Sequence, residues 1–466
     1  MDRPLNLVAI SSAGGSGPIP PAPHKHVVLD PLGAPAQILQ SETRKIMDQM
    51  TQKISRRSFV KGSAAVAGLS IFGMPSIIKA APQGVIKYGT MHPLTGAYSA
   101  LGADQMKATQ LAVDEWNAKG GVMGRKIEWI YRDDQLNGAV ALRRVKELVE
   151  EDKCDFIGGT LSGAISLAIN EFAGKNKVPY MAYCQSDMLL GSDLNKYGFA
   201  FMVFPYSAAL ATSKYTFTKI GKKWFSLTAD YRWGHSLLEG WMWQSEQMGG
   251  QFVGNVYAPL GATDFSTYFT RIMAAKPDVL VMNNLGADQT AALKQASELG
   301  LTKRMKIVCT KTALTTLKEV GPAYDENVLG GMSFYWGLRD KYPASKKFMD
   351  AYMKRFGAPV EQDGECGYVA TNVLFMAMEK AKSTTDKEKI AAAVEGLKYT
   401  LTKGPESVRA CDHQRVQSYL LLRGKGRKAK DWDVADIVEE VPGESILMSC
   451  ADNSKKLPFV NIKLPK

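Results

Sequence analysis

Ser162-Gly163-Ala164 is a run of small residues that stands between a predicted strand and a predicted helix. We predict the strand over 155–158 and the helix over 162–175. The first N–H groups of a helix are free of carbonyl partners, and the helix dipole adds positive charge at that end. The run could therefore bind a carboxylate, or Ser162 could cap its own helix.

Sequence motifs for catalysis or metal binding are absent after residue 81. There is no nucleophile elbow, no GxGxxG after a strand, no HExxH and no P-loop. The six cysteines form no CxxC pair and only three histidines remain, which argues against a zinc or iron–sulfur site. We expect no catalytic residue, no metal and no cofactor, although the cysteines permit disulfides in an oxidising compartment. The histidines are His92, His235 and His413, and the cysteines are Cys154, Cys184, Cys309, Cys366, Cys411 and Cys450.

The basic charge of the chain is concentrated near its start. The formal net charge is +12, and residues 1–81 hold nine Lys or Arg residues against four acids, which leaves +7 for the other 385 residues. That excess is ordinary for a protein surface, so we expect no nucleic-acid partner. Hydrophobic residues make up 45% of the chain, enough for a sizeable core.

The first 81 residues differ in character from the rest. Residues 1–46 are rich in Gly, Pro, Ala and Ser, and we expect them to be disordered or never translated. Residues 47–81 hold Arg56-Arg57, then Phe59 and Lys61, then a weakly apolar run too short for a stable membrane span. This segment resembles a twin-arginine signal peptide, which predicts export to the periplasm by the twin-arginine translocase. A buried helix that happens to follow an arginine pair is the alternative.

Short β-like runs alternate with helical periods over most of the remaining chain. One βα series covers about 85–182 and a second covers about 208–310. The tail after 344 is less regular, with three helices and two late strands. Alternating βα units predict parallel sheets with helices on both faces. The fold class is therefore α/β, with two doubly wound parallel-sheet lobes.

Five stretches coincide in order and spacing with one family. They are 87–102, 112–127, 155–162, 257–266 and 275–280. In them the chain resembles periplasmic solute-binding proteins of the branched-chain amino acid and amide class, the leucine-binding-protein type, which feed ATP-binding cassette importers.

This resemblance implies two lobes joined by three crossovers, with a solute held in the cleft between them. Lobe one would comprise 82–205 plus 332–413, and lobe two 206–331 plus 414–466. The expected partners are a small solute and the permease and ATPase subunits of an importer in the membrane.

The resemblance and the positions of residues at strand ends and at the first crossover together give a set of candidate ligand-binding residues. In the family, the segment that matches Ser162 and Gly163 holds the ligand carboxylate, and a hydroxyl that matches Ser186 assists it. Ser186 could instead cap a helix, Tyr98 could be a surface aromatic, and Trp233 could belong to the core. The full set is Tyr98, Ser162, Gly163, Gln185 and Ser186 from lobe one, with Tyr206, Trp233, Asn283, Asn284 and Lys311 from lobe two.

Lys311 departs from the family pattern. Amino-acid-binding relatives place an acid in this loop to pair with the ligand ammonium, whereas this chain has a base. An α-amino acid would then leave its ammonium unpaired, so we expect a carboxylate without an amine. Alternatively, Lys311 is a solvated loop residue, and Asp230 or Asp288 supplies the missing charge.

Two other function classes stay open at this stage. One is a secreted enzyme or cofactor-carrying protein, because the twin-arginine route often serves proteins that fold before export. The other is a periplasmic sensor with the same fold that signals through a separate membrane protein.

Overall fold

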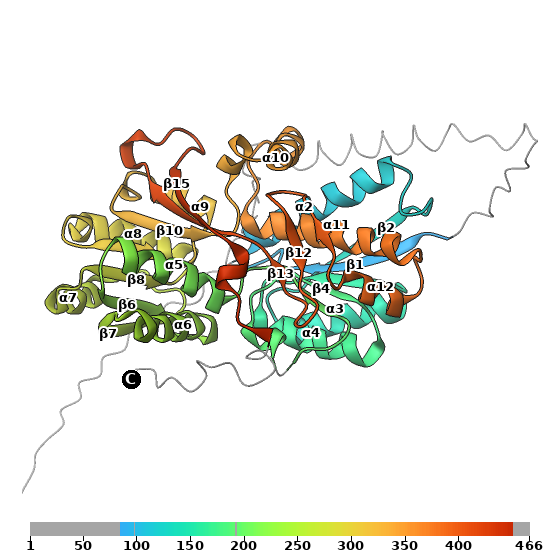
Figure 1. Cartoon of the computed structure of the whole chain (residues 1–466), viewed down its shortest axis with the longest axis horizontal. Helices are drawn as coiled ribbons and strands as arrows, with labels where there is room; N and C mark the ends of the chain where they lie inside the picture. The colour runs from blue at the N-terminus through green and yellow to red at the C-terminus, as the bar shows by residue number, and fades with distance from the viewer. Residues whose placement is uncertain (1–83, 97, 192, 451–466) are drawn as a thin grey trace, which may run out of the picture. The chain divides into compact units, whose positions relative to one another are not determined.

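The computed structural model describes residues 84–450 apart from 97 and 192, which belong to one compact unit over Lys79–Lys466. The predicted disordered extension and signal peptide lie outside the described residues. No helix in the described part is long and apolar enough to cross a membrane. The elements form one parallel and one mostly parallel sheet with helices around them, and a small antiparallel sheet (Figure 1).

The first sheet has five parallel strands in the order β2-β1-β3-β4-β5. We call this sheet and its helices lobe one. Its strands are β1 Ile86–His92, β2 Ile127–Asp133, β3 Phe156–Gly159, β4 Tyr180–Ala182 and β5 Gly198–Ala200. Its helices are α2 Ser99–Ala118, α3 Gly138–Lys146, α4 Gly163–Asn176, α10 Pro343–Phe356, α11 Gln362–Ala381 and α12 Lys387–Val394. The π-helical turn η1 Glu147–Glu151 continues α3.

Both faces of this sheet are buried, as alternating side chains of one strand show. Tyr88 of β1 packs in a cluster with Ala108 of α2 and Val369 of α11. Met91 of the same strand packs in a cluster with Val145 of α3. The long helix α11, from late in the chain, packs along α2 (Figure 1). Burial on both faces explains why the inner strands β3 and β4 hold no charged residue, whereas the edge strand β2 is partly exposed and holds Glu128, Arg132 and Asp133.

The second sheet has seven strands in the order β15-β14-β10-β9-β8-β6-β7, and we call it lobe two with its helices. Its five parallel strands, of which β7 forms one edge of the sheet, are β6 Lys223–Ala229, β7 Gln251–Ala258, β8 Val279–Asn283, β9 Lys306–Cys309 and β10 Val328–Met332. The late strands β14 Tyr419–Gly424 and β15 Ala435–Val441 join antiparallel at one edge. Its helices are α5 Pro205–Lys219, α6 Arg232–Met248, α7 Ser266–Ala275, α8 Ala287–Glu298 and α9 Leu314–Val320.

The chain passes between the lobes three times: after β5, after β10 and before β14. This arrangement confirms the fold class that the sequence predicts. Beside the last crossing lies a small antiparallel sheet of β11 Lys398–Tyr399, β12 Glu406–Val408 and β13 Arg415–Val416. The strands β5 and β10, the helix α9 and this small sheet were not among the predicted elements, because each is short and lacks a clear period.

Candidate ligand-binding site

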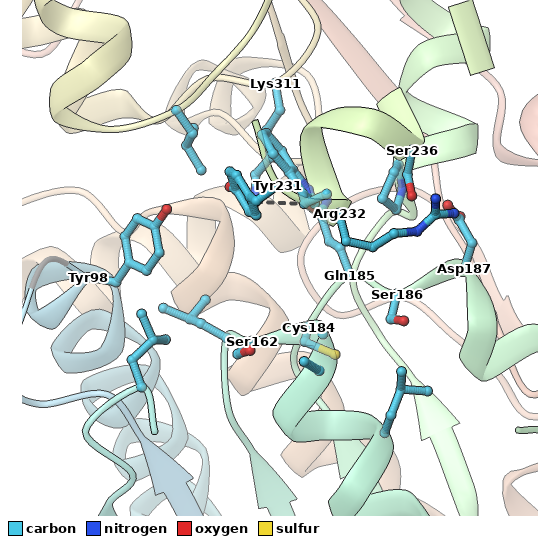
Figure 2. A pocket seen from close by; sticks show the side chains of 18 of the residues that line it. Tyr98, Ser162, Cys184, Gln185, Ser186, Asp187, Tyr231, Arg232, Ser236 and Lys311 are labelled. Carbon is cyan, nitrogen blue, oxygen red and sulfur yellow. Dashed lines mark hydrogen bonds between the residues drawn. The ribbon is translucent and has the colours of Figure 1, made fainter. Parts of the chain in front are cut away.

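A cavity of about 360 Å³ lies where loops of the two lobes face each other. Lobe one contributes the loops after β3 and β4 and the start of α2, and lobe two contributes the loops after β6 and β9. These loops follow the carboxyl ends of parallel strands, where doubly wound sheets bind ligands. Figure 2 shows the side chains of both lobes directed into this space. Its walls are mainly apolar and include Leu101, Leu136, Leu161, Leu167, Leu260 and Leu285.

The start of α4 is held against the cavity by an unusual backbone turn. Thr160 adopts a left-handed conformation with φ 61°, although it is β-branched. Its hydroxyl donates to Asp134 Oδ2 at 2.8 Å, which holds the turn in place. Ser162 then both lines the cavity and accepts from the Ile165 N–H at 3.4 Å. The two alternatives for Ser162, ligand contact and helix cap, are therefore compatible.

Gly163 allows the start of α4 to approach the next loop of lobe one. A Cβ atom at this position would lie 2.8 Å from the carbonyl oxygen of Gln185, which is closer than side chains tolerate. Ser186 lines the cavity beside it and makes no capping hydrogen bond to the 3-10 turn Asp187–Leu190 that follows. The Ser186 hydroxyl is therefore not engaged as the helix cap that the alternative interpretation assigned to it.

Gln185 connects the two lobes through its side chain. Its amide nitrogen donates to the carbonyl oxygen of Val203 in its own lobe. Its Oε1 accepts from Trp233 Nε1 at 2.9 Å and from Lys311 Nζ at 3.4 Å, both in lobe two. A single side chain of lobe one, Gln185, thus contacts two side chains of lobe two at the cavity.

Three aromatic side chains form one wall. The rings of Tyr231 and Trp233 stack with centroids 6.0 Å apart. The Tyr98 phenol lies near that of Tyr231, and burial raises the pKa of both phenols. These phenols therefore stay neutral near pH 7, and Tyr98 and Trp233 both line the cavity.

Lys311 is buried, not solvated. Its Nζ lies 3.6 Å from Asp363 Oδ1, and the side chains are 5% and 2% exposed. Asp363 is at the start of α11, which packs in lobe one, and both residues line the cavity. The acid that this cavity contains next to Lys311 is therefore Asp363 from the other lobe, and Asp230 and Asp288 are not among its lining residues.

A second cluster of charged side chains lies beside the cavity and comprises Arg232, Glu239 and Asp187. Arg232 makes two hydrogen bonds with Glu239, at 2.9 and 3.0 Å. Asp187 is buried nearby and accepts from the Tyr206 N–H at 3.4 Å. Burial raises the pKa of Asp187 to about 7, although the Tyr206 N–H and the charge of Arg232 act in the opposite direction. Asp187 can therefore exchange a proton near neutral pH.

The cavity unites most of the residues expected from the sequence and leaves three out. Tyr206 is buried against Trp243 in lobe two, with ring centroids 5.6 Å apart. Asn283 is buried inside lobe two, where it donates to Ser226 and accepts from Thr310. Asn284 is buried next to it. The residues that do line the cavity are Tyr98, Ser162, Gly163, Gln185, Ser186, Trp233 and Lys311.

Sequence reasoning did not select Asp187, Tyr231, Arg232 or Asp363. The first three are chain neighbours of selected residues, so their place after a strand was a usable signal. Asp363 carried no such signal, because it begins a helix far along the chain. The part of the chain that the structure describes contains no His, Cys, Asp and Glu group suited to hold a metal ion.

Residues 85–430 match the sequence profile of a family described as periplasmic binding protein. The chain belongs to this family. Among curated members, a Leu/Ile/Val-binding protein homolog 6 from Brucella melitensis is 23% identical over 352 residues, which cover 74% of this chain and 88% of that protein. The family expected from the sequence is thereby confirmed.

Solved structures of other periplasmic binding proteins have the same fold. An amino acid ABC transporter substrate-binding protein from Pseudomonas fluorescens Pf-5 is 27% identical, with a TM-score of 0.74 over 80% of this chain and 99% of that one. A solute-binding protein of an ABC transporter from Rhodopseudomonas palustris, in complex with 3,4-dihydroxybenzoic acid, is 24% identical, with a TM-score of 0.69 over 77% and 96%. This periplasmic binding protein therefore shares the two-lobed type I architecture.

Proposed function

We propose that this chain is the solute receptor of an ATP-binding cassette importer and that it binds a small carboxylate between its lobes. The observation that carries the proposal is the cavity itself, in which the amino end of α4 and the Ser186 hydroxyl meet a mainly apolar wall. Helix N–H groups and hydroxyls can bind an anion without a neutralising arginine. The permease and ATPase subunits of the importer would be its partners in the membrane.

Similar proteins support a role in solute binding. The similar proteins named above are a Leu/Ile/Val-binding protein homologue and two ABC transporter solute-binding proteins. The complex with 3,4-dihydroxybenzoic acid is evidence that the fold can enclose an aromatic carboxylate. In this chain the aromatic wall consists of Tyr98, Tyr231 and Trp233. Their ring faces could pack against the aromatic ring of such a carboxylate.

An enzymatic role is not favoured by the groups that line the cavity. Burial raises the pKa of the Cys184 thiol to about 12, so this sulfur stays protonated and is a poor nucleophile. Lys311 pairs with Asp363, and Arg232 pairs with Glu239. The charged groups thus hold each other in place, as expected of a receptor.

Titration calorimetry on the purified protein tests the proposal. The probes are benzoate, pentanoate and leucine, and small-angle scattering with and without the tightest one reports closure of the lobes. At least one carboxylate should bind, and Ser186→Ala should weaken it by about 10-fold or more, since a charge-assisted hydrogen bond is lost. Ser407→Ala, in the small sheet outside the cavity, is the matched control. Binding by none of the probes, with no change in scattering, would contradict the proposal.

We also propose export to the periplasm through the twin-arginine translocase, on the basis of Arg56-Arg57. The Cys411–Cys450 disulfide supports an oxidising destination. Replacing both arginines with lysine should retain the protein in the cytoplasm, because the translocase reads the paired guanidinium groups. Cell fractionation measures this, with Lys53→Arg, a basic position of the same segment outside the arginine pair, as the control. Normal periplasmic accumulation of the double variant would rule out this route.

A further inference from the structure

We propose that Lys311 and Asp363 together recognise a hydroxyl group of the solute, so that the natural ligand is a hydroxylated carboxylate. This inference rests on the proposed function, because it concerns the same cavity. It adds a second recognition point at two buried side chains of the cavity lining, separate from the start of α4.

Asp363 presents an oxygen that the protein leaves without a donor. Its Oδ1 faces Lys311 Nζ at 3.6 Å, whereas its Oδ2 is buried and makes no hydrogen bond within the described residues. A buried carboxylate oxygen without a donor is unfavourable, and a ligand that supplies one removes the penalty. Since Asp363 lines the cavity, a solute can supply this donor.

Lys311 has capacity for a further acceptor. Its ammonium carries three N–H donors, and its two contacts are to Asp363 at 3.6 Å and to Gln185 Oε1 at 3.4 Å. Both distances exceed the 2.7–2.9 Å that is usual for charge-assisted hydrogen bonds. An acceptor on the solute could therefore bind the ammonium without breaking a short contact.

A hydroxyl group complements both side chains at once. It can donate its hydrogen to Asp363 Oδ2 and accept from Lys311 Nζ. A ligand ammonium would face the like charge of Lys311, and a second carboxylate would face the like charge of Asp363. A methyl group would leave Oδ2 without a donor. The pair therefore selects for a neutral group that both donates and accepts.

The two side chains come from different lobes, which gives the pair a role in closure. Lys311 follows β9 of lobe two, and Asp363 lies in the first turn of α11 of lobe one. A solute hydroxyl that bridges them would bind both lobes and favour the closed form. A solute without it would gain only the contacts at the start of α4 and the apolar walls.

Matched probes that differ by one hydroxyl test this inference by calorimetry. The probes are benzoate with its 3-hydroxy and 4-hydroxy derivatives, and pentanoate with 4-hydroxypentanoate and 5-hydroxypentanoate. We expect one hydroxylated probe to bind the unmodified protein at least 10-fold more tightly than its parent. In Lys311→Met with Asp363→Ala, which removes both charges together, this ratio should fall to about 1 while the parent still binds. Asp363→Asn, a more conservative variant, should also lower the ratio.

An exposed Lys–Asp pair on α10 provides the control. Lys346→Met with Asp350→Ala removes a Lys–Asp pair that is not part of the cavity lining and should leave the ratio unchanged. Equal binding of parent and hydroxylated probes, or a ratio that survives in the Lys311/Asp363 variant, would overturn the inference and leave the proposed function intact. Failure of every carboxylate to bind would overturn both.

Discussion

Asp187 is a carboxyl group that the fold buries beside two other charged side chains. Arg232 and Glu239 face it from α6, and the Tyr206 N–H donates to it. Burial dominates over the attraction of Arg232 and raises the pKa of Asp187 from 3.8 to about 7. Because Asp187 lines the cavity, its protonation state also affects the charge that a bound anion meets.

The raised pKa predicts a specific dependence of stability on pH. Between about pH 4 and pH 7 the folded protein binds this proton and the unfolded chain releases it, so the free energy of unfolding falls as pH rises through this window. Asp187→Asn cannot titrate. The unmodified protein should therefore lose stability relative to this variant from pH 4 to pH 7, by an amount on the order of a few kcal/mol, and the difference should level off above pH 7.

Urea unfolding at several pH values measures this difference. Glu246→Gln, at an exposed position of α6, is the control and should show no such trend. A difference between the unmodified protein and Asp187→Asn that stays constant from pH 4 to pH 7 would show that Asp187 titrates normally.

At the scale of elements, the small sheet β11–β13 is joined to lobe one by a buried ion cluster. Arg415 of β13 binds Glu365 of α11 at 2.6 and 3.0 Å and both oxygens of Glu406 in β12 at 2.9 Å. All three side chains are almost fully buried. Removing one member of such a cluster leaves a buried charge without its partner, so the cluster fixes the position of this sheet.

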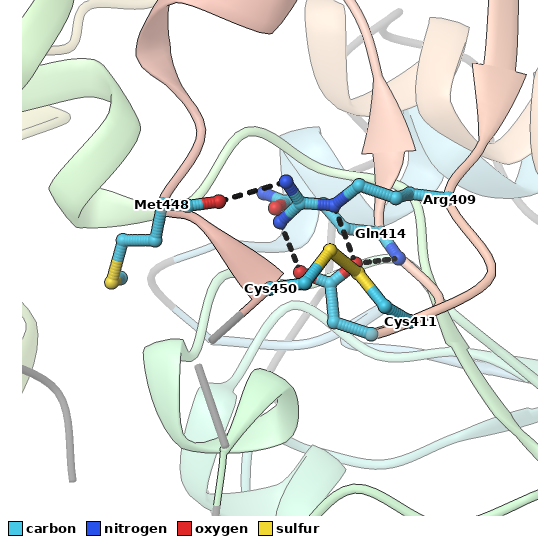
Figure 3. Close-up of a disulfide and its surroundings, with 6 residues drawn as sticks. Arg409, Cys411, Gln414, Met448 and Cys450 are labelled. Atoms are coloured by element: carbon cyan, nitrogen blue, oxygen red, sulfur yellow. Dashed lines mark hydrogen bonds and ion pairs between the residues drawn. A yellow bond between two sulfur atoms is a disulfide. The ribbon is translucent and has the colours of Figure 1, made fainter. Parts of the chain in front are cut away.

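The end of the described chain is attached to the same region by a disulfide. Cys450 comes after β15 of lobe two, whereas Cys411 lies between β12 and β13 (Figure 3). Arg409 reinforces the connection, since it donates to the Met448 carbonyl at 2.8 Å. The disulfide thus links the chain beyond lobe two to the sheet beside lobe one.

Replacing both cysteines with serine should lower the free energy of unfolding by about 4 kcal/mol, because the bond closes a loop with a sequence separation of 39. Urea unfolding with and without a reductant measures this loss. Reductant should destabilise the unmodified protein to a similar extent and leave the double variant unchanged. If reductant does not alter the unfolding of the unmodified protein, the disulfide does not contribute as proposed.

At the scale of the whole molecule, the two sheets face each other with the carboxyl ends of their parallel strands toward one cavity. Gln185 makes polar contacts across this space to Trp233 and Lys311, so the described form is one in which the lobes are in contact. Opening the lobes would break these hydrogen bonds, and a solute that contacts both lobes would add to the interactions that favour the closed form.

Much of this architecture could be predicted from the sequence. The two βα series, the fold class and the family follow from local periodicity and from motifs such as 87–102. The start of α4 and the residues Gln185, Ser186 and Trp233 were found because each lies in or near a loop that follows a strand and because the family resemblance pointed to the same segments. The ends of parallel strands share one edge, so loop position and the resemblance together place these residues at one cavity.

Only the tertiary structure shows which candidate residues reach the cavity and which distant residues contact each other. Asn283 also ends a strand, but its side chain forms hydrogen bonds inside lobe two and does not reach the cavity. Tyr206 packs against Trp243 instead. The pairing of Lys311 with Asp363 joins residues from different lobes, as the disulfide joins Cys411 to Cys450. Local sequence patterns report the conformation of neighbouring residues, whereas contacts between distant segments depend on how the lobes pack against each other.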